Sequence, residues 1–245
     1  MPKRGDVRFD VPLYTVAEAA RYVKVPESTY GTWSRGYDRT LRDPRGRRRK
    51  VHGDPVIAAF PAAKRSQPVV PFVGLAESMV LAAFRKGGVS LQHIRQTIPL
   101  LKAQIGTHHA LAFERLHTDG AVILFDFAHR GGNDEEAAEQ LSGLTRIVDG
   151  QRVFAEVVRD YLRRITYGDD GWAAELVLPY GDHEVLKIRP DRAAGRPLFV
   201  RGGAPLDDVV SRWRAGDRLA DLAADYEVPT DDLEDALRAA VEVAA

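Results

Sequence analysis

The fold is decided by residues 14–36, which read YTVAEAARYVKVPESTYGTWSRG. Thr15 and Glu18 have the spacing of a capping box, in which Thr15 caps a helix and Glu18 reaches back to the cap. The apolar side chains that follow recur at helical spacing, and the expected helix runs to about Lys24. The stretch therefore predicts a first helix over about residues 16–24.

A second helix is expected directly after a tight turn. Pro26 ends the first helix and suits the first turn of the next, where its missing N–H would have no partner. Tyr30 and Trp33 lie on one face of this second helix, over about residues 27–35, and Gly36 ends it. Two short helices joined in this way are typical of a helix-turn-helix, whose second helix reads the major groove.

Short polar groups and one guanidinium occupy the other face of the second helix. We expect these four to contact DNA: Ser28, Thr29, Thr32 and Arg35. Gly31 weakens the helix, since an interior glycine costs up to about 1 kcal/mol relative to alanine. From this spacing alone, an ordinary helical hairpin is the alternative.

A strongly basic run follows the second helix. Its cations are Arg39, Arg42, Arg45, Arg47, Arg48, Arg49 and Lys50. Pro44 and Gly46 are turn formers, so the run predicts a loop or hairpin tip that resembles the wing of a winged helix. A solvated surface is the alternative, but charges of one sign repel each other and favour a phosphate partner. We expect five of them to bind DNA: Arg45, Arg47, Arg48, Arg49 and Lys50.

Charge is distributed unevenly along a chain whose formal net charge is zero. Residues 1–70 carry 15 Lys and Arg against 7 Asp and Glu, whereas residues 202–245 carry 4 against 11. The basic head suits phosphate, and the acidic tail suits a basic protein or pocket. The alternative is that charge simply varies between domains.

Composition excludes several classes of protein. The chain has no cysteine, which excludes disulfides, cysteine-based zinc sites and thiol catalysis and favours a reducing, cytoplasmic location. The N-terminus lacks the apolar run of a signal peptide. The longest apolar stretch, residues 69–84, is interrupted by Pro71 and Glu77, so we expect no membrane span.

The sequence shows no pattern of catalytic or metal-binding residues. His108 and His109 are adjacent and do not share a helix face, and the acids of residues 130–136 lack partner ligands at a defined spacing. A phosphate-binding glycine loop, a serine elbow and an acid–base pair are also missing. We expect no enzyme activity, no metal and no cofactor; a metal-dependent hydrolase that uses His and Asp is the least favoured alternative.

Three domains are expected. Residues 1–66 form a winged helix-turn-helix, residues 67–182 a middle region, and residues 183–245 a helical domain. In the middle region, after a Pro-containing linker at residues 66–71, we predict helices over about residues 74–85, 90–104 and 153–164, and hairpins over about 116–127 and 165–178. A strand over about residues 185–188 follows.

The C-terminal domain is predicted to be a three-helix, helix-turn-helix-like unit with a short strand. The strand covers about residues 198–200 and the helices about 206–214, 218–226 and 231–241, the second capped by Asp217. Its core is Leu219, Leu222, Tyr226, Val228, Leu233 and Leu237. Acidic residues at the start of the last helix disfavour binding to phosphate and favour protein contact or dimerisation. The fold class is therefore α+β, mainly α.

The N-terminal segment resembles the MerR/excisionase type of helix-turn-helix. The resemblance covers about forty residues and is carried by residues 14–20, residues 25–30 and Trp33. It implies a winged DNA-binding module that acts in transcription.

The C-terminal segment, from about residue 188 to residue 240, resembles the small VapB-type antitoxin domain, long known only as a domain of unknown function. The pattern is carried by Gly195-Arg196-Pro197, Gly202-Gly203-Ala204-Pro205-Leu206, Ala215-Gly216-Asp217, and the helices at 222–226 and 231–237. The resemblance implies an antitoxin whose toxin is a PIN-like ribonuclease with an acidic, metal-dependent pocket.

An antitoxin that also represses its own operon as a homodimer is the function that both resemblances imply. Candidates for contact with the toxin are Arg189, Arg192, Arg196 and Arg201; alternatively, the acidic tail covers the toxin's basic RNA-binding surface. The runner-up is a MerR-like regulator that senses a small molecule through residues 74–180.

Overall fold

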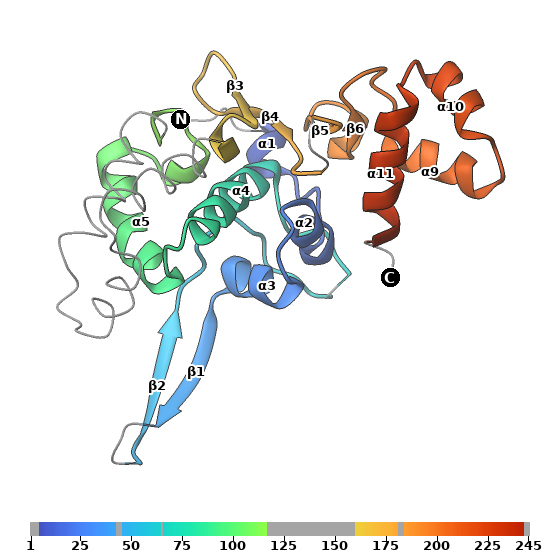
Figure 1. Ribbon diagram of the computed structural model, residues 1–245. Helices are drawn as coiled ribbons and strands as arrows, with labels where there is room; N and C mark the ends of the chain where they lie inside the picture. Colours follow the sequence, from blue (N-terminus) through green and yellow to red (C-terminus); the bar gives the residue numbers. More distant parts are fainter. Residues whose placement is uncertain (1–4, 43–45, 65, 117–159, 181–183, 243–245) are drawn as a thin grey trace, which may run out of the picture.

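The chain is a mainly helical α+β protein, as predicted, and the residues that the structure describes form two small antiparallel sheets (Figure 1). The computed structural model describes residues 5–42, 46–64, 66–116, 160–180 and 184–242. The hairpin predicted at residues 116–127, the acidic loop at 130–136 and most of the helix predicted at 153–164 lie outside these ranges. None of the helices in the described ranges is long and apolar enough to cross a membrane.

The N-terminal unit has the predicted helix-turn-helix followed by a hairpin. Its elements are α1 (Val7–Asp10), α2 (Val16–Tyr22), α3 (Glu27–Arg35), β1 (Tyr37–Arg42) and β2 (Arg48–Gly53). The capping box is confirmed: the Thr15 hydroxyl accepts from the Glu18 N–H at 3.2 Å, and the Glu18 carboxylate accepts from the Thr15 N–H at 2.8 Å. Gly36 ends α3 with a positive φ of 74°.

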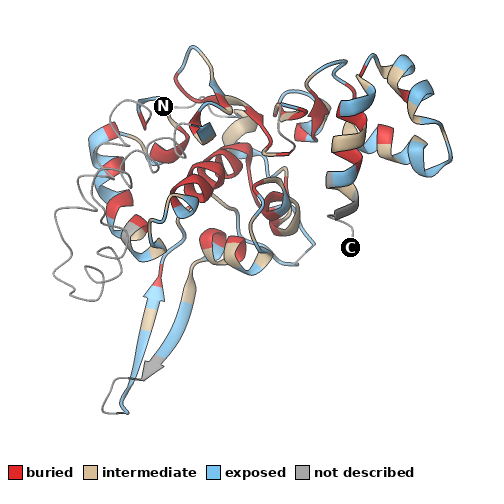
Figure 2. Cartoon of the chain, viewed as in Figure 1, coloured by how far each residue is buried: buried red, intermediate tan, exposed pale blue. Residues whose placement is uncertain are grey.

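A long buried helix, α4 (Phe72–Lys86), forms the centre of the molecule. All of its residues except Arg85 and Lys86 are buried (Figure 2). A helix that is apolar on nearly all sides must be surrounded by other elements. The helix α5 (Leu91–Ile105) and the short 3-10 helix η1 (Ala110–Ala112) follow, and η1 packs against α4.

The start of α4 is tied to the N-terminal unit. The backbone of Val70 pairs with that of Tyr14, and the side chains of Val69 and Val70 are buried. The expectation of a linker at residues 66–71 is therefore wrong for its second half, because that backbone forms a β-bridge. The domain boundary expected at residue 66 stays a prediction.

A four-stranded antiparallel sheet separates the central body from the last helices. Its strands, in spatial order, are β3 (Ile165–Tyr167), β4 (Ala173–Val177), β5 (Leu186–Ile188) and β6 (Leu198–Phe199). The predicted hairpin at residues 165–178 and the strands near residues 185–188 and 198–200 are thus confirmed. A short 3-10 turn, η3 (Ala193–Gly195), joins β5 to β6.

Three helices form the C-terminal unit, as predicted: α9 (Leu206–Arg214), α10 (Leu219–Tyr226) and α11 (Thr230–Glu242). Four of the six predicted core residues are buried, namely Leu222, Val228, Leu233 and Leu237, and the other two pack partly buried against them. The prediction that Asp217 caps α10 is wrong. The cap residue is Arg218, and the Asp217 carboxylate instead accepts from Arg212 Nε at 2.6 Å. Arg212 also pairs with Asp225 of α10 at 2.8 Å, which ties α10 to α9.

The C-terminal half contacts the N-terminal unit at α2, away from the hairpin (Figure 1). The Tyr180 hydroxyl donates to the carbonyl oxygen of Arg21 at 2.8 Å. Gly195 lies so close to Tyr14 that a Cβ at this position would be 2.6 Å from the tyrosine oxygen. The basic N-terminal hairpin and the acidic C-terminal segment therefore lie on different parts of the molecule.

Candidate nucleic-acid and protein interfaces

The helix α3 is anchored from inside by two aromatic side chains. Tyr30 and Trp33 are 0% and 1% exposed, and their ring centres are 6.0 Å apart. The carbonyl oxygen of Trp33 also accepts from the N–H of Val56 at 2.8 Å, where the chain returns from the hairpin. This anchoring fixes which face of α3 is turned outward.

The four residues expected to read DNA lie on the outer side of α3. Ser28 and Arg35 are exposed, whereas Thr29 and Thr32 are half-buried. The Thr32 hydroxyl donates to the carbonyl oxygen of Ser28 at 3.0 Å, so its oxygen is left to accept. The structure thus brings the four together on one helix, and their contact with bases stays a prediction.

Gly31 has a local role that the sequence did not indicate. A Cβ at this position would lie 2.5 Å from Arg35 Nη2, so the guanidinium lies back along the helix over the glycine. We expect Gly31→Ala to raise the free energy of unfolding by up to about 1 kcal/mol, because alanine favours the helix and the flexible Arg35 can move. Urea unfolding measures this. A loss of stability would show that Arg35 cannot leave its position.

The hairpin β1–β2 projects from the body beside α3 and exposes its cations (Figures 1 and 2). Arg47, Arg48, Arg49 and Lys50 are all exposed; Arg45 lies outside the described residues. Because side chains alternate across a strand, Arg48 and Lys50 lie on one face and Arg49 on the other. The basic run therefore forms a wing of positive charge on both faces.

The root of the wing is closely packed. Gly36 has a positive φ, and a Cβ there would lie 2.2 Å from the carbonyl oxygen of Gly53. Tyr37 pairs with Gly53 across the hairpin, and its ring covers that glycine. Glycine at both positions lets the two strands meet where α3 ends.

A histidine at the wing root lies between two carboxylates. His52 Nδ1 is 2.8 Å from Asp38 Oδ1, and its Nε2 is 3.2 Å from Asp54 Oδ1. The hydrogen bond and attraction of Asp38, followed by those of Asp54, raise the pKa of His52 above its ordinary value. Protonation lets both ring nitrogens donate.

This arrangement makes the stability of the wing pH-dependent. Because the folded pKa of His52 is raised, its contribution is fully present below the unfolded pKa of about 6.5 and is lost as the pH rises through the folded pKa. We expect an NMR titration to place the His52 pKa above 6.5, and Asp38→Asn with Asp54→Asn to return it there. A wild-type pKa that equals that of the double variant would contradict the assignment.

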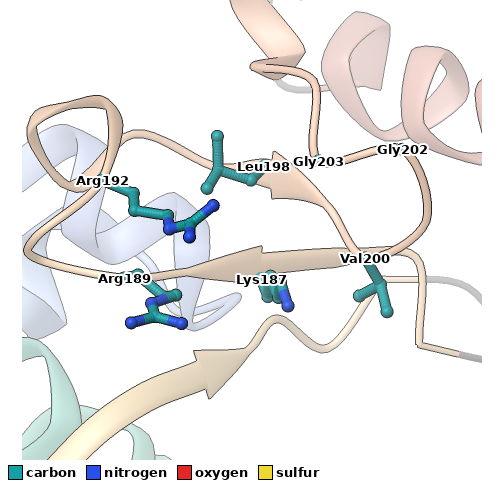
Figure 3. A pocket seen from close by; sticks show the side chains of 7 residues that line it. All are labelled: Lys187, Arg189, Arg192, Leu198, Val200, Gly202 and Gly203. Atoms are coloured by element: carbon teal, nitrogen blue, oxygen red, sulfur yellow. The ribbon is translucent and has the colours of Figure 1, made fainter. Parts of the chain in front are cut away.

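A second basic site lies on the small sheet of the C-terminal half. A hollow of about 450 Å³ is lined by Lys187, Arg189, Arg192, Leu198, Val200, Gly202 and Gly203. Figure 3 shows Lys187 on β5, Arg189 directly after this strand and Arg192 in the loop that follows, facing Leu198 of β6. Three cations around one hollow attract an acidic group.

The four arginines expected to contact a toxin differ in what holds them. Arg201 donates from Nε to the fully buried Asp232 at 2.8 Å and ties the loop after β6 to α11. Arg196 lies within 4 Å of Asp207 and Asp208.

The other two arginines line the hollow. Arg189 donates to Asp191 at 2.9 Å and holds the pKa of that carboxyl below its ordinary value. Arg192 is exposed, and none of the described carboxylates forms an ion pair with it. Arg192 is therefore the member of the set whose guanidinium is most available.

Sequence reasoning missed Lys187. Its alternation with Leu186 and Ile188 in the strand was a signal that its side chain faces away from the core. Lys187 also pairs with Glu175 of β4 at 3.2 Å. Within the described ranges, no group of three or more His, Asp or Glu side chains has the arrangement of a metal site.

Comparisons with known proteins match both ends of the chain. Residues 12–98 match a family described as "Putative DNA-binding HTH domain", and residues 186–239 match one described as "Protein of unknown function (DUF433)". The chain is thus a helix-turn-helix protein with a C-terminal DUF433 domain. Both resemblances seen in the sequence are confirmed.

Relatives cover nearly the whole chain. "Putative antitoxin VapB45" of Mycobacterium tuberculosis is 43% identical over 96% of each chain, and this protein belongs to its family. "Uncharacterized protein Rv2308" of the same organism is 24% identical over 94% of this chain and 90% of its own. The crystal structure of Rv2018, also from M. tuberculosis, matches with a TM-score of 0.74 and 41% identity over 94% of this chain and 99% of that one.

Proposed function

We propose that this protein is an antitoxin of a type II toxin–antitoxin system, which neutralises a PIN-like, VapC-type ribonuclease and represses its own operon. Its family includes a relative named as an antitoxin, and its N-terminal domain matches a DNA-binding family. The two basic sites lie on separate parts of the molecule, one for each proposed partner.

The observation that carries the proposal is the exposed basic wing beside α3. Arg47, Arg48, Arg49 and Lys50 project from the body on a hairpin, next to the polar outer face of α3. A helix fits the major groove, and cations on an adjacent wing neutralise phosphates of the same duplex. One such unit reads few base pairs, so we include a homodimer that binds paired half-sites.

The basic hollow supports a contact with the toxin. A PIN-like toxin has an acidic pocket, and a guanidinium forms short, often bidentate hydrogen bonds with carboxylates. Arg189 and Arg192 line the hollow; Arg189 is paired with the exposed Asp191, whereas Arg201 is held by the fully buried Asp232. We therefore assign the contact to Arg189 and Arg192 and a structural role to Arg201.

Co-expression with the product of the neighbouring gene tests the proposal. We expect that product to inhibit growth when expressed alone, and this protein to relieve the inhibition and to copurify with it. The absence of both inhibition and a copurifying partner would contradict the antitoxin function.

Reversing charge in the hollow tests the assigned contact. Arg189→Glu with Arg192→Glu is expected to weaken binding of the toxin at least hundredfold, since truncating one partner of a buried charge pair costs about 2–5 kcal/mol. Isothermal titration calorimetry measures the change. Arg163→Glu with Arg214→Glu, at two exposed positions elsewhere, gives the same change in charge and should leave affinity within a factor of two. Equal losses in the two variants would remove the hollow from the interface.

A regulator that senses a small molecule is the second candidate, favoured by a hollow beside α3. This hollow of about 380 Å³ is lined by Val16, Ser34, Arg35, Pro55, Ala59, Phe60, Pro61, Ala62, Gln67 and Val69. Its volume lies in the range of small-molecule sites. It lies outside residues 74–180, where the effector was expected. Val16→Trp places a larger side chain in the hollow. An effector that changes the DNA affinity of the wild-type protein but not the DNA affinity of this variant would favour this candidate.

A further inference from the structure

Arg95 of α5 contacts both parts of the proposed DNA-binding surface. Its Nη2 donates to the carbonyl oxygen of Thr32 in α3 at 3.3 Å. Its guanidinium carbon lies 5.0 Å from the ring centre of Tyr37, the first residue of β1. Arg95 lies well beyond residue 66, where the DNA-binding unit was expected to end, yet one side chain joins α5, α3 and the wing.

The surroundings of Arg95 are unfavourable for a cation. Its Nε and Nη1 are covered by protein, and no described residue accepts a hydrogen bond from them. Burial lowers the pKa of Arg95, opposed by the attraction of Tyr37 and of Asp54. Buried donors without partners are rare in folded proteins, and each calls for an explanation. If Arg95 served only to fill space, an apolar side chain would do so at a lower cost in free energy.

The tyrosine that Arg95 contacts is the first residue of β1 and packs against the last residue of β2. Tyr37 pairs with Gly53 in the register of the hairpin, and a Cβ on Gly53 would lie 2.5 Å from a carbon of the tyrosine ring. The guanidinium of Arg39 also lies 5.0 Å from the ring centre. The position of this ring therefore determines how β1 and β2 leave the body together.

A small rotation at the root displaces the tip of the wing by a large distance. Each strand has six residues and extends for roughly 20 Å at about 3.3 Å per residue. A tilt of roughly 10° at the root then moves the tip by about 3.5 Å, more than the length of a hydrogen bond. The phosphate contacts of the wing thus depend on what fixes the root.

We propose that Arg95 is a positioning residue, which fixes the angle between α3 and the wing so that the two bind DNA as a single surface. The proposal rests on the DNA-binding function proposed above. Arg95 acts through the ring of Tyr37 and the carbonyl of Thr32, and it makes no contact with DNA itself because two of its three nitrogens are covered.

The first test needs no DNA. The chain has no cysteine, so Thr40→Cys in the wing and Arg21→Cys in α2 give two unique sites for nitroxide labels, both exposed. Pulsed EPR should show one narrow distance distribution, which Arg95→Ala broadens. Lys102→Ala, which removes a cation from an exposed position of the same helix, should leave the distribution narrow. An unchanged distribution in the Arg95 variant would overturn the proposal.

The second test measures coupling to the wing cations. Arg95→Ala is expected to weaken DNA binding about tenfold in the wild-type wing, but less than twofold when Arg47, Arg48 and Arg49 are replaced by alanine. A loss of equal size in both backgrounds, with a salt dependence lowered by about one, would instead show a direct phosphate contact and overturn the positioning role. Arg95→Lys provides a milder variant with the same expected direction should alanine prevent folding.

The two tests separate this proposal from the function on which it rests. If the wild-type protein does not bind DNA, the proposed DNA-binding function fails, while the distance distribution still decides whether Arg95 fixes the wing. If the wild-type protein binds DNA and the distribution does not change, only the role of Arg95 fails.

Discussion

Replacing Arg47, Arg48 and Arg49 together by alanine is expected to weaken DNA binding about hundredfold at 0.15 M salt. Each phosphate contact that is lost lowers the slope of log affinity against log salt by about 0.9, so the slope should fall by about three. If the two proteins bind equally at 1 M salt, this difference in slope produces the loss of affinity at 0.15 M salt. Fluorescence anisotropy over a range of salt concentrations measures both quantities.

A matched control separates a wing contact from a general effect of charge. Replacing Arg163, Arg214 and Arg218 by alanine removes three cations from exposed positions outside the wing. We expect the slope of this control to stay within about 0.5 of the wild-type value, because these residues lie outside the proposed DNA-binding surface. A triple wing variant with an unchanged slope would remove the wing from the interface.

Trp33→Ala is expected to lower the free energy of unfolding by about 3–5 kcal/mol, the usual cost of removing a buried large aromatic side chain. Trp33 is 1% exposed and packs beside Tyr30, so the cavity would lie directly beneath α3. Urea unfolding at constant pH measures the loss. DNA affinity should fall with the folded fraction, because the outer face of α3 exists only while its inner face is packed.

The control is Trp33→Phe. The indole N–H of Trp33 has no hydrogen-bond partner among the described residues, so phenylalanine removes an unsatisfied donor while it keeps most of the apolar volume. We expect this variant to lose less than about 1.5 kcal/mol, as for a volume-conserving change. A cost for alanine below about 1 kcal/mol would mean that the core under α3 rearranges without penalty.

The elements that the sequence predicted best are those with strong local signals. Thr15 and Glu18 are three residues apart, so their capping box is readable without knowledge of the fold. Pro26 and Gly36 bound the second helix for reasons of backbone geometry, and the run of like charges identified the wing. In each case, the residues that produce the signal lie close together in the sequence.

Features that depend on distant partners could not be predicted. Arg201 and Asp232 are 31 residues apart, so no local pattern distinguished Arg201 from the other arginines. Asp217 had the position of a helix cap, but it pairs with Arg212 of the preceding helix. Arg95 was not singled out, because its contacts with Thr32 and Tyr37 are set by how α5 packs.

Operator recognition is tested most directly by the affinity of the purified protein for DNA from upstream of its own gene. The affinity is measured in 0.15 M salt, beside a random duplex of equal length, with and without the neighbouring gene product. We expect the protein to bind the upstream DNA at least a thousandfold more tightly than the random duplex. The complex with the neighbouring gene product should retain this preference. Equal affinity for the two duplexes would contradict operator recognition, and with it the proposal that this antitoxin relative regulates its own operon.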